Sequence, residues 1–296
     1  TPAKQDNLRV DRSGRKGIAM NQVVATKIKH LEHWFNHFES ILIAYSGGVD
    51  SALVMTIAHR QLHEKALACI GVSPSYPHRE KEQAITMAKE LGIPYRLIET
   101  SEYSDPNYTA NPSNRCYFCK TELFNQLQRV ADKEGWQVIV DGTNADDTSD
   151  DRAGIKAAHE YGIRSPLLEV DISKEQVRAI AHQLKIPAWD KPAMACLSSR
   201  VPHGVPITPT LLRQIELAED SLAEKGFKQF RVRHHGDLAR IEVPQEDFLR
   251  AHDLRSDIVA GLRKVGYRHV CLDLAGFRST PSTDLDVVSV TVKGKT

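Results

Sequence analysis

The chain has 296 residues, of which 41% are hydrophobic and 26% are charged, an ordinary composition for a globular protein. Its 39 basic and 38 acidic residues give a net charge of +1, which argues against a broad nucleic-acid-binding face. No apolar run approaches the roughly 18 residues of a membrane span. Because the five cysteines are odd in number and no export signal is recognised, we predict a cytoplasmic protein without membrane or nucleic-acid partners.

Strand and helix patterns alternate through the first two thirds of the chain. The expected strands cover residues 41–45, 66–72, 95–99 and 137–140, and the expected helices cover 21–38, 50–63, 78–91, 116–134 and 173–184. This alternation predicts an α/β fold, with a parallel sheet covered by helices on both faces. Ligands of such folds bind beyond the carboxyl ends of the strands, where Ser46, Ser73, Asp141 and Gly142 fall.

The last third of the chain has a different pattern. A proline-rich segment at 189–210 predicts a linker that crosses the active site, followed by helices at 211–225 and 247–265 and strands at 230–233, 239–243 and 269–274. We therefore expect a nucleotide-binding domain at 20–200 and a small α+β domain for substrate binding or oligomerisation at 201–280. Residues 1–19 are expected to be a disordered arm or a vector remnant, and 281–296 a tail.

One short loop predicts a phosphate site. Ser46-Gly47-Gly48-Val49-Asp50-Ser51 follows an apolar strand and opens a helix, so its backbone amides and the helix N-terminus can face an anion. Asp50 has the oxygen ligands that Mg²⁺ prefers, although an aspartate here can equally cap the helix. The loop resembles the SGGxDS loop of PP-loop ATP pyrophosphatases, which cleave ATP between the α and β phosphates and adenylate a substrate.

Three cysteines form the second candidate site. Cys116 and Cys119 share one face at the start of a helix, where Arg115 and Lys120 are expected to favour the thiolate, and Cys196 comes 77 residues after Cys119. The residues alone leave four readings open: an iron–sulfur cluster, a zinc site completed by His203, a redox pair, or inert thiols. Cys69 and Cys271, in apolar strands, are predicted to be small core residues.

Charged residues near the C-terminus form the third candidate site. Arg231 and Arg233 alternate along a strand and so share a face, where they could grip a phosphate or form ion pairs with Glu242 or Asp237. On the first helix, the spacing of the histidines is typical of an exposed polar face: His30, His33 and His37.

Motifs across residues 21–278 together resemble the LarE family of ATP-dependent sulfur transferases. The motifs are Ser46–Ser51, the segments at 141–147 and 164–167, Lys191-Pro192-Ala193, the segment at 196–200, Arg231-Val232-Arg233, the segment at 239–242, and Gly276-Phe277-Arg278. The resemblance implies thiolation of pyridinium-3,5-biscarboxylic acid mononucleotide, on the route to the nickel-pincer nucleotide cofactor. It also implies ATP and Mg²⁺ as cofactors and a homo-oligomer, with the sulfide donor open.

The resemblance assigns roles to individual residues. The ATP site would comprise Ser46, Gly47, Gly48, Val49, Asp50 and Ser51, with Asp50 near Mg²⁺, and Gly142 and Thr143 beside the nucleotide. The substrate phosphate would meet Ser199, Arg200, Arg231 and Arg233. Acidic positions associated with metal binding match Glu219, Glu242 and Asp247.

The family has two sulfur chemistries. One branch sacrifices a cysteine at the position of Ala195; the other holds a 4Fe–4S cluster with three cysteines, as Cys116, Cys119 and Cys196 would here. The second branch implies that cluster-bound sulfide attacks the adenylated carboxylate. A PP-loop enzyme that thiolates tRNA, an amidating synthetase, a zinc-stabilised nucleotide-binding module and sacrificial transfer from Cys196 are the alternatives.

Overall fold

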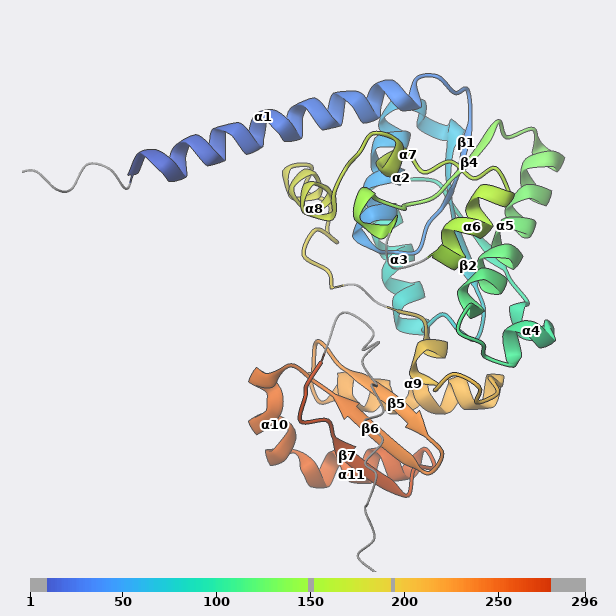
Figure 1. The fold of residues 1–296 in the computed structure, drawn as a ribbon, viewed down its shortest axis with the longest axis vertical. Helices are drawn as coiled ribbons and strands as arrows, with labels where there is room; N and C mark the ends of the chain where they lie inside the picture. Colours follow the sequence, from blue (N-terminus) through green and yellow to red (C-terminus); the bar gives the residue numbers. More distant parts are fainter. Residues whose placement is uncertain (1–9, 149–151, 193–194, 278–296) are drawn as a thin grey trace, which may run out of the picture. The chain divides into compact units, whose positions relative to one another are not determined.

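The computed structural model describes residues 10–148, 152–192 and 195–277, and the chain divides into two compact units, Thr1–Arg213 and Gln214–Thr296. Figure 1 shows the elements of both units. No helix in the described ranges is long and apolar enough to cross a membrane. The expected tail at 281–296, Ala193 of the Lys191-Pro192-Ala193 motif and Arg278 of the last motif lie outside the described residues.

The first unit begins with a long helix and then alternates strands with helices. Its strands are β1 (Ile41–Ala44), β2 (Ala66–Val72), β3 (Tyr95–Glu99) and β4 (Val138–Val140). Its helices are α1 (Val10–Phe35), α2 (Val49–Leu62), α3 (His78–Glu90), α4 (Pro106–Thr109), α5 (Arg115–Glu134), α6 (Arg152–Glu160), α7 (Pro166–Glu169) and α8 (Lys174–Gln183). Short 3₁₀ helices lie at His63–Lys65, Glu102–Ser104, Ala145–Thr148 and Leu197–Arg200.

The four strands form one parallel sheet in the order β3-β2-β1-β4, which confirms the predicted fold class. Ile43 of β1 pairs with Ala68 of β2 on one side and with Val140 of β4 on the other. The chain leaves β1 toward β2 and later returns to β4 on the opposite side of β1. The carboxyl ends of β1 and β4 therefore flank the switch point at which open α/β sheets bind ligands.

Helices cover both faces of this sheet because the buried strand residues alternate between two apolar cores. Ile41 and Ile43 pack in a core with α1, α2, α3 and α8, whereas Leu42 packs with α5 and α6 in a second core. Figure 1 shows α5 and α6 together on one side of the strands, and α2, α7 and α8 together on the other.

Local sequence signals account for several element boundaries. The side chain of Ser173 accepts from the Gln176 amide and the Gln176 side chain accepts in return, so α8 starts with the predicted capping box. Helix α5 ends at Gly135, whose φ of +77° lies in the left-handed region that favours glycine. Helix α1 begins at Val10, well before the predicted start at Asn21, and so takes in part of the segment 1–19.

The second unit is a small α+β arrangement. Its strands are β5 (Arg231–His235), β6 (Leu238–Glu242) and β7 (His269–Leu272), and its helices are most of α9 (Pro209–Glu224), α10 (Phe248–Asp253) and α11 (Arg255–Lys264), with a 3₁₀ helix at Gln245–Asp247. Strand β6 lies between antiparallel β5 and parallel β7. The core position predicted for Cys271 is wrong: β7 is an edge strand, and alternation points this thiol to solvent.

Candidate active site

The loop Ser46–Ser51 lies between β1 and α2, at the carboxyl end of the sheet. Gly47 has a φ of +74°, and a Cβ atom there would lie 2.9 Å from the Cβ of Ala84. Glycine is therefore required at this position both by backbone conformation and by space. Gly48 precedes α2 without any side-chain cap, so no side chain of its own covers the first-turn amides of the helix.

Side-chain hydrogen bonds hold the loop in a tight turn. The Ser46 amide donates to Ser51 Oγ (3.2 Å), and Ser51 Oγ donates to the Gly48 carbonyl (3.2 Å). The Tyr76 hydroxyl donates to the Ser46 carbonyl over 3.0 Å. These bonds fix the backbone before any ligand arrives, which is the arrangement expected of an anion-binding loop.

Residues after β4 close the other side of the loop. Gly142 approaches α2 so closely that a Cβ atom on it would lie 2.7 Å from the Ser51 nitrogen. Asp141 is buried and accepts from the Thr143 amide (3.1 Å), from Thr143 Oγ1 (2.8 Å) and from Ser165 Oγ (2.7 Å). The predicted nucleotide residues Gly142 and Thr143 are therefore brought against the Ser46–Ser51 loop, and Asp141 holds them there.

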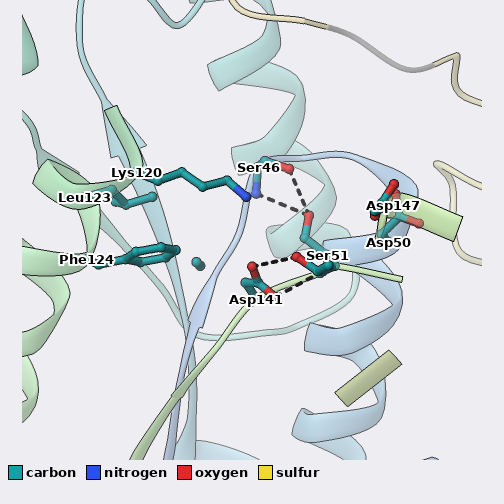
Figure 2. A pocket seen from close by; sticks show the side chains of 11 residues that line it. Ser46, Asp50, Ser51, Lys120, Leu123, Phe124, Asp141 and Asp147 are labelled. Carbon is teal, nitrogen blue, oxygen red and sulfur yellow. Dashed lines mark hydrogen bonds between the residues drawn. The ribbon is translucent and has the colours of Figure 1, made fainter. Parts of the chain in front are cut away.

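Asp50 points away from the helix backbone into a polar group of side chains. Its carboxylate forms an ion pair with Lys174 Nζ and accepts from Asn144 Nδ2 (3.2 Å). Asp147 lies beside Asp50 (Figure 2), and burial, with the charge of Asp50 as a smaller cause, raises the pKa of the Asp147 carboxyl. Mg²⁺ with ATP commonly uses one or two carboxylates plus phosphate oxygens, so the donor set at Asp50 fits that ion.

Two pockets lie on either side of the loop and share Ser46 and Asp50. The α5-side pocket, of about 240 Å³, is drawn in Figure 2 and is also lined by Lys120, Phe124 and Gly142. The Cys196-side pocket, of about 290 Å³, is lined by the loop together with Tyr76, Glu80, Lys174, Lys191, Ala195 and Cys196. A ligand bound at Ser46 and Asp50 can therefore extend into both spaces.

A buried ion pair supports the Cys196-side pocket. Lys191 Nζ lies 2.7 Å from Glu80 Oε2, and both side chains are largely buried. The same ammonium donates to the Gly47 carbonyl over 3.4 Å. Sequence analysis missed Glu80, Lys174 and Tyr76 because each sits in an ordinary amphipathic or capping pattern with no chemical signature of its own.

Polar bonds join the segment that precedes Cys116 to the segment around Cys196. Tyr108 and Ser198 share a hydrogen bond of 2.6 Å between their hydroxyls, and Arg115 Nη1 donates to the Ser198 carbonyl (3.1 Å). Asn111 Nδ2 donates to the carbonyls of Pro202 (2.8 Å) and Val205 (3.0 Å). These contacts bring the CxxC helix α5 and the Cys196 segment to the same end of the first unit.

The three cysteines differ in exposure and in proton affinity. Cys116 is exposed, whereas Cys119 and Cys196 are half-buried. Burial raises the pKa of the Cys119 thiol well above its usual value, and the charges of Glu102, Cys196 and Cys116 add to the rise. The thiolate expected here from Arg115 is therefore not favoured at Cys119 without a ligand, because the guanidinium offsets only part of this rise.

Glu102 is a buried acid beside the cysteine segments that sequence analysis did not identify. It accepts hydrogen bonds from Ser73 and Ser75, and the Ser75 carbonyl accepts from the Leu197 amide (2.9 Å), next to Cys196. Its second oxygen, Oε2, is buried without a hydrogen-bond partner. Within the described residues, no three His, Cys, Asp or Glu side chains converge on a single metal ion.

The predicted phosphate residues Ser199 and Arg200 wrap the Cys196 segment. Arg200 is almost fully buried, and its Nη1 donates to the carbonyls of Ala195 (2.8 Å) and Cys196 (3.2 Å). Ser199 Oγ donates to the same Cys196 carbonyl over 2.8 Å. In this structure, both side chains therefore position Cys196.

Arginine side chains gather around Glu242 in the second unit. Arg233 Nε lies 2.9 Å from Glu242 Oε1, Arg240 Nη2 lies 3.2 Å from the same oxygen, and Arg231 Nη1 lies 4.0 Å from Oε2. Arg231 also stacks on Phe277, with its guanidinium 4.3 Å from the ring centre. The predicted shared face of Arg231 and Arg233 is thus present, and so is the ion pairing with Glu242.

The remaining metal candidates do not form one site among the residues that the structure describes. Glu242 is engaged by arginines, and Glu219 is buried and accepts from the Val232 amide (3.0 Å). Asp247 lies at the start of α10 and is half-buried. His203 and the three histidines His30, His33 and His37 are exposed.

Comparison with known proteins agrees with this geometry. A family model described as NAD synthase matches residues 22–116, which include the Ser46–Ser51 loop. An uncharacterized protein of Synechocystis sp. is 45% identical over 87% of this chain and 97% of its own length. The pyridinium-3,5-bisthiocarboxylic acid mononucleotide synthase of Lactiplantibacillus plantarum is 35% identical over 88% of this chain and 95% of its own length. A glutamine-hydrolyzing GMP synthase polypeptide of Methanopyrus kandleri is 28% identical over about half of each chain (49% and 50%).

The parallel sheet, the glycine loop after β1 and the close approach of Gly142 define a PP-loop nucleotide-binding fold. Identity to the Lactiplantibacillus plantarum enzyme extends over both units. The chain belongs to the LarE family.

Proposed function

We propose that this protein is an ATP-dependent sulfur transferase that thiolates the carboxylates of pyridinium-3,5-biscarboxylic acid mononucleotide. The single observation that carries the proposal is that two pockets share Ser46 and Asp50, and that Cys196 lines one of them. A nucleotide on the loop and a sulfur-bearing group at the cysteines can then meet across the Cys196-side pocket. The name of the Lactiplantibacillus plantarum relative supports the choice of substrate.

The first step is adenylation. An oxygen of the substrate carboxylate attacks the α-phosphorus of ATP, the bond from that phosphorus to the bridging oxygen breaks, and pyrophosphate leaves with the electron pair. The Ser46–Ser51 amides and the N-terminus of α2 would hold the leaving pyrophosphate, which lowers the barrier by offsetting its growing charge. Mg²⁺ held by Asp50 would neutralise phosphate charge during this step.

The second step exchanges oxygen for sulfur. A sulfide nucleophile attacks the activated carbonyl carbon, the carbon–oxygen bond to AMP breaks, and the thiocarboxylate and AMP leave. Arg200 and Ser199 would keep the Cys196 segment in place during attack, because both donate to its backbone carbonyl. The arginines Arg231 and Arg233 would bind the phosphate of the mononucleotide, since guanidinium groups grip phosphate with two hydrogen bonds.

Cys116, Cys119 and Cys196 would hold a 4Fe–4S cluster in this proposal. Three cysteines fit such a cluster with one iron lacking a protein ligand, and the two cysteine segments are joined by the bonds from Tyr108 and Arg115 to Ser198. A cluster of several irons keeps its thiolates further apart than one ion does, so the absence of a mononuclear site in the described ranges is compatible with it. When bound, the cluster would supply an iron that can carry the extra sulfide.

The test uses chain purified without oxygen. We expect about four irons and at least as many acid-labile sulfides per chain. With ATP, Mg²⁺, sulfide and the biscarboxylic mononucleotide, we expect pyrophosphate release and a product whose mass reflects oxygen replaced by sulfur. Cys119→Ala should lose iron and thiolation, whereas Cys271→Ser, an exposed thiol in the second unit, should keep both.

Two outcomes would contradict parts of the proposal. Zinc, or no metal, in active chain would exclude the cluster and direct mass spectrometry to loss of sulfur from Cys196 during turnover. Pyrophosphate release with ammonia and an unchanged rate in the Cys119→Ala variant would instead indicate an amidating synthetase.

A further inference from the structure

We propose that Lys174 is a cation that changes partner during the reaction. It holds the Asp50 carboxylate in the nucleotide-free protein and moves to the polyphosphate of ATP once Mg²⁺ takes Asp50. The inference rests on the proposed function only in that ATP binds at the Ser46–Ser51 loop.

The contacts of Lys174 combine a fixed backbone with a movable ammonium. Its amide donates to Asp146 Oδ2 (2.7 Å), which anchors the first residue of α8 to the 3₁₀ helix after β4. Its Nζ forms an ion pair with Asp50, and its side chain is 34% exposed. A long lysine stem with a partly exposed head can swing between partners while the backbone stays in place.

The position of Lys174 gives it a second partner within reach. Lys174 lines the Cys196-side pocket together with Ser46, Gly48 and Asp50, which belong to the phosphate loop. An ammonium released from Asp50 would therefore already lie in the space that the loop opens to. Phosphate oxygens at the loop would attract it more strongly than water does, because the pocket walls lower the local dielectric.

The other lysine of this pocket is less free to take that role. Lys191 is held by the largely buried Glu80 at 2.7 Å and donates to the Gly47 carbonyl, so its charge is committed to a structural pair. Lys174, in contrast, is paired with the acid that Mg²⁺ would use. Loading Mg²⁺ thus displaces one cation from Asp50 and supplies another to the phosphates.

The charges around Asp50 explain why a resident cation is needed. Asp50 and Asp147 lie close enough for the charge of Asp50 to raise the pKa of the Asp147 carboxyl, and the charge of Lys174 opposes that rise. Without the ammonium, two neighbouring carboxylates would repel each other at the empty site. Lys174 therefore prepares the site for a divalent ion and competes with that ion until ATP arrives.

The experiment compares Lys174→Gln with wild type and with Lys185→Gln, an exposed lysine that follows the other end of α8. Mn²⁺ binding is measured without nucleotide by electron paramagnetic resonance, and binding of α,β-methylene-ATP with Mg²⁺ by calorimetry. Lys174→Gln should bind Mn²⁺ about threefold to fivefold more tightly, because an ion-pair competitor is gone. It should bind the nucleotide about tenfold more weakly, because a charged contact is lost. Lys174→Arg and Lys185→Gln should resemble wild type in both assays.

Opposite signs in the two assays are the signature of a cation that changes partner. Equal or weaker Mn²⁺ binding in Lys174→Gln, or unchanged nucleotide binding, would overturn the inference, since a merely structural lysine would weaken both or neither. Failure of wild type to bind α,β-methylene-ATP would instead refute the proposed ATP site. Thermal denaturation of each variant checks that folding is intact, and Lys174→Arg keeps the nucleotide assay informative if the glutamine variant unfolds.

Discussion

Gly142 and Ser51 meet at the switch point of the sheet, where a Cβ atom on Gly142 would lie 2.7 Å from the Ser51 nitrogen. The contact presses the turn after β4 against the first turn of α2. Neither backbone can retreat, because Asp141 anchors one side and the loop serines anchor the other.

Gly142→Ala should therefore destabilise the protein by about 1–3 kcal/mol, the usual cost of inserting a methyl group into a packed site. Binding of α,β-methylene-ATP should fall with it, because the phosphate loop is displaced. Gly48→Ala is the matched control for stability, since a Cβ there meets only Ser46 Oγ at 3.5 Å. Equal melting temperatures for the two variants in thermal denaturation would show that the contact is not strained.

Glu80→Gln should destabilise the chain by about 3 kcal/mol, because it leaves the Lys191 ammonium buried without its carboxylate. The double variant Glu80→Gln with Lys191→Met should regain most of that loss, since no buried charge remains. Urea unfolding measures both. Glu82→Gln, two residues away and exposed, should change the free energy of unfolding by less than about 0.5 kcal/mol. A double variant as unstable as the single one would contradict the argument.

The sequence predicted those parts of the fold that depend on local pattern. Strands at 66–72 and 95–99 have the predicted boundaries, and the loop at Ser46 is placed by its own glycines and by the strand before it. Helix α6 (Arg152–Glu160) was not predicted, nor was the start of α1 at Val10.

Side-chain partners far apart in the sequence could not be predicted in the same way. The pair of Glu80 and Lys191 and the pair of Asp50 and Lys174 depend on how α3 and α8 pack on the sheet, and neither leaves a periodic signal. Cys271 was misplaced for a related reason. Its neighbours are apolar, but only the sheet order shows that β7 lies at an edge.

Arg233→Ala should weaken binding of the mononucleotide substrate about tenfold, because a charged hydrogen bond to phosphate is lost. Binding of α,β-methylene-ATP should not change, since Arg233 lies in the second unit and the nucleotide loop in the first. Isothermal calorimetry with each ligand separates the two effects. Arg268→Ala is the control, because that exposed arginine pairs only loosely with Asp237 at 3.7 Å. A loss equal to that of the control would remove Arg233 from the substrate site.

The imidazoles of β5 predict a pH dependence of stability. Burial lowers the pKa of His234, and the charge of His235 lowers it further; burial, followed by Arg240 and Arg233, lowers the pKa of His235. The unfolded chain therefore binds more protons than the folded chain as the pH falls through about 6.5, the ordinary histidine value. Stability should rise with pH across this window and be lost on acidification.

Replacing both residues, His234→Gln with His235→Gln, should flatten that slope, because neither side chain then titrates. The measurement is urea unfolding at several pH values below and above about 6.5, with the variant subtracted from the parent. His252→Gln removes an exposed histidine of α10 and should keep the parental slope. If the double variant kept the full slope, the acid sensitivity would have to come from groups outside β5, because these two histidines are the ones whose folded environment opposes protonation.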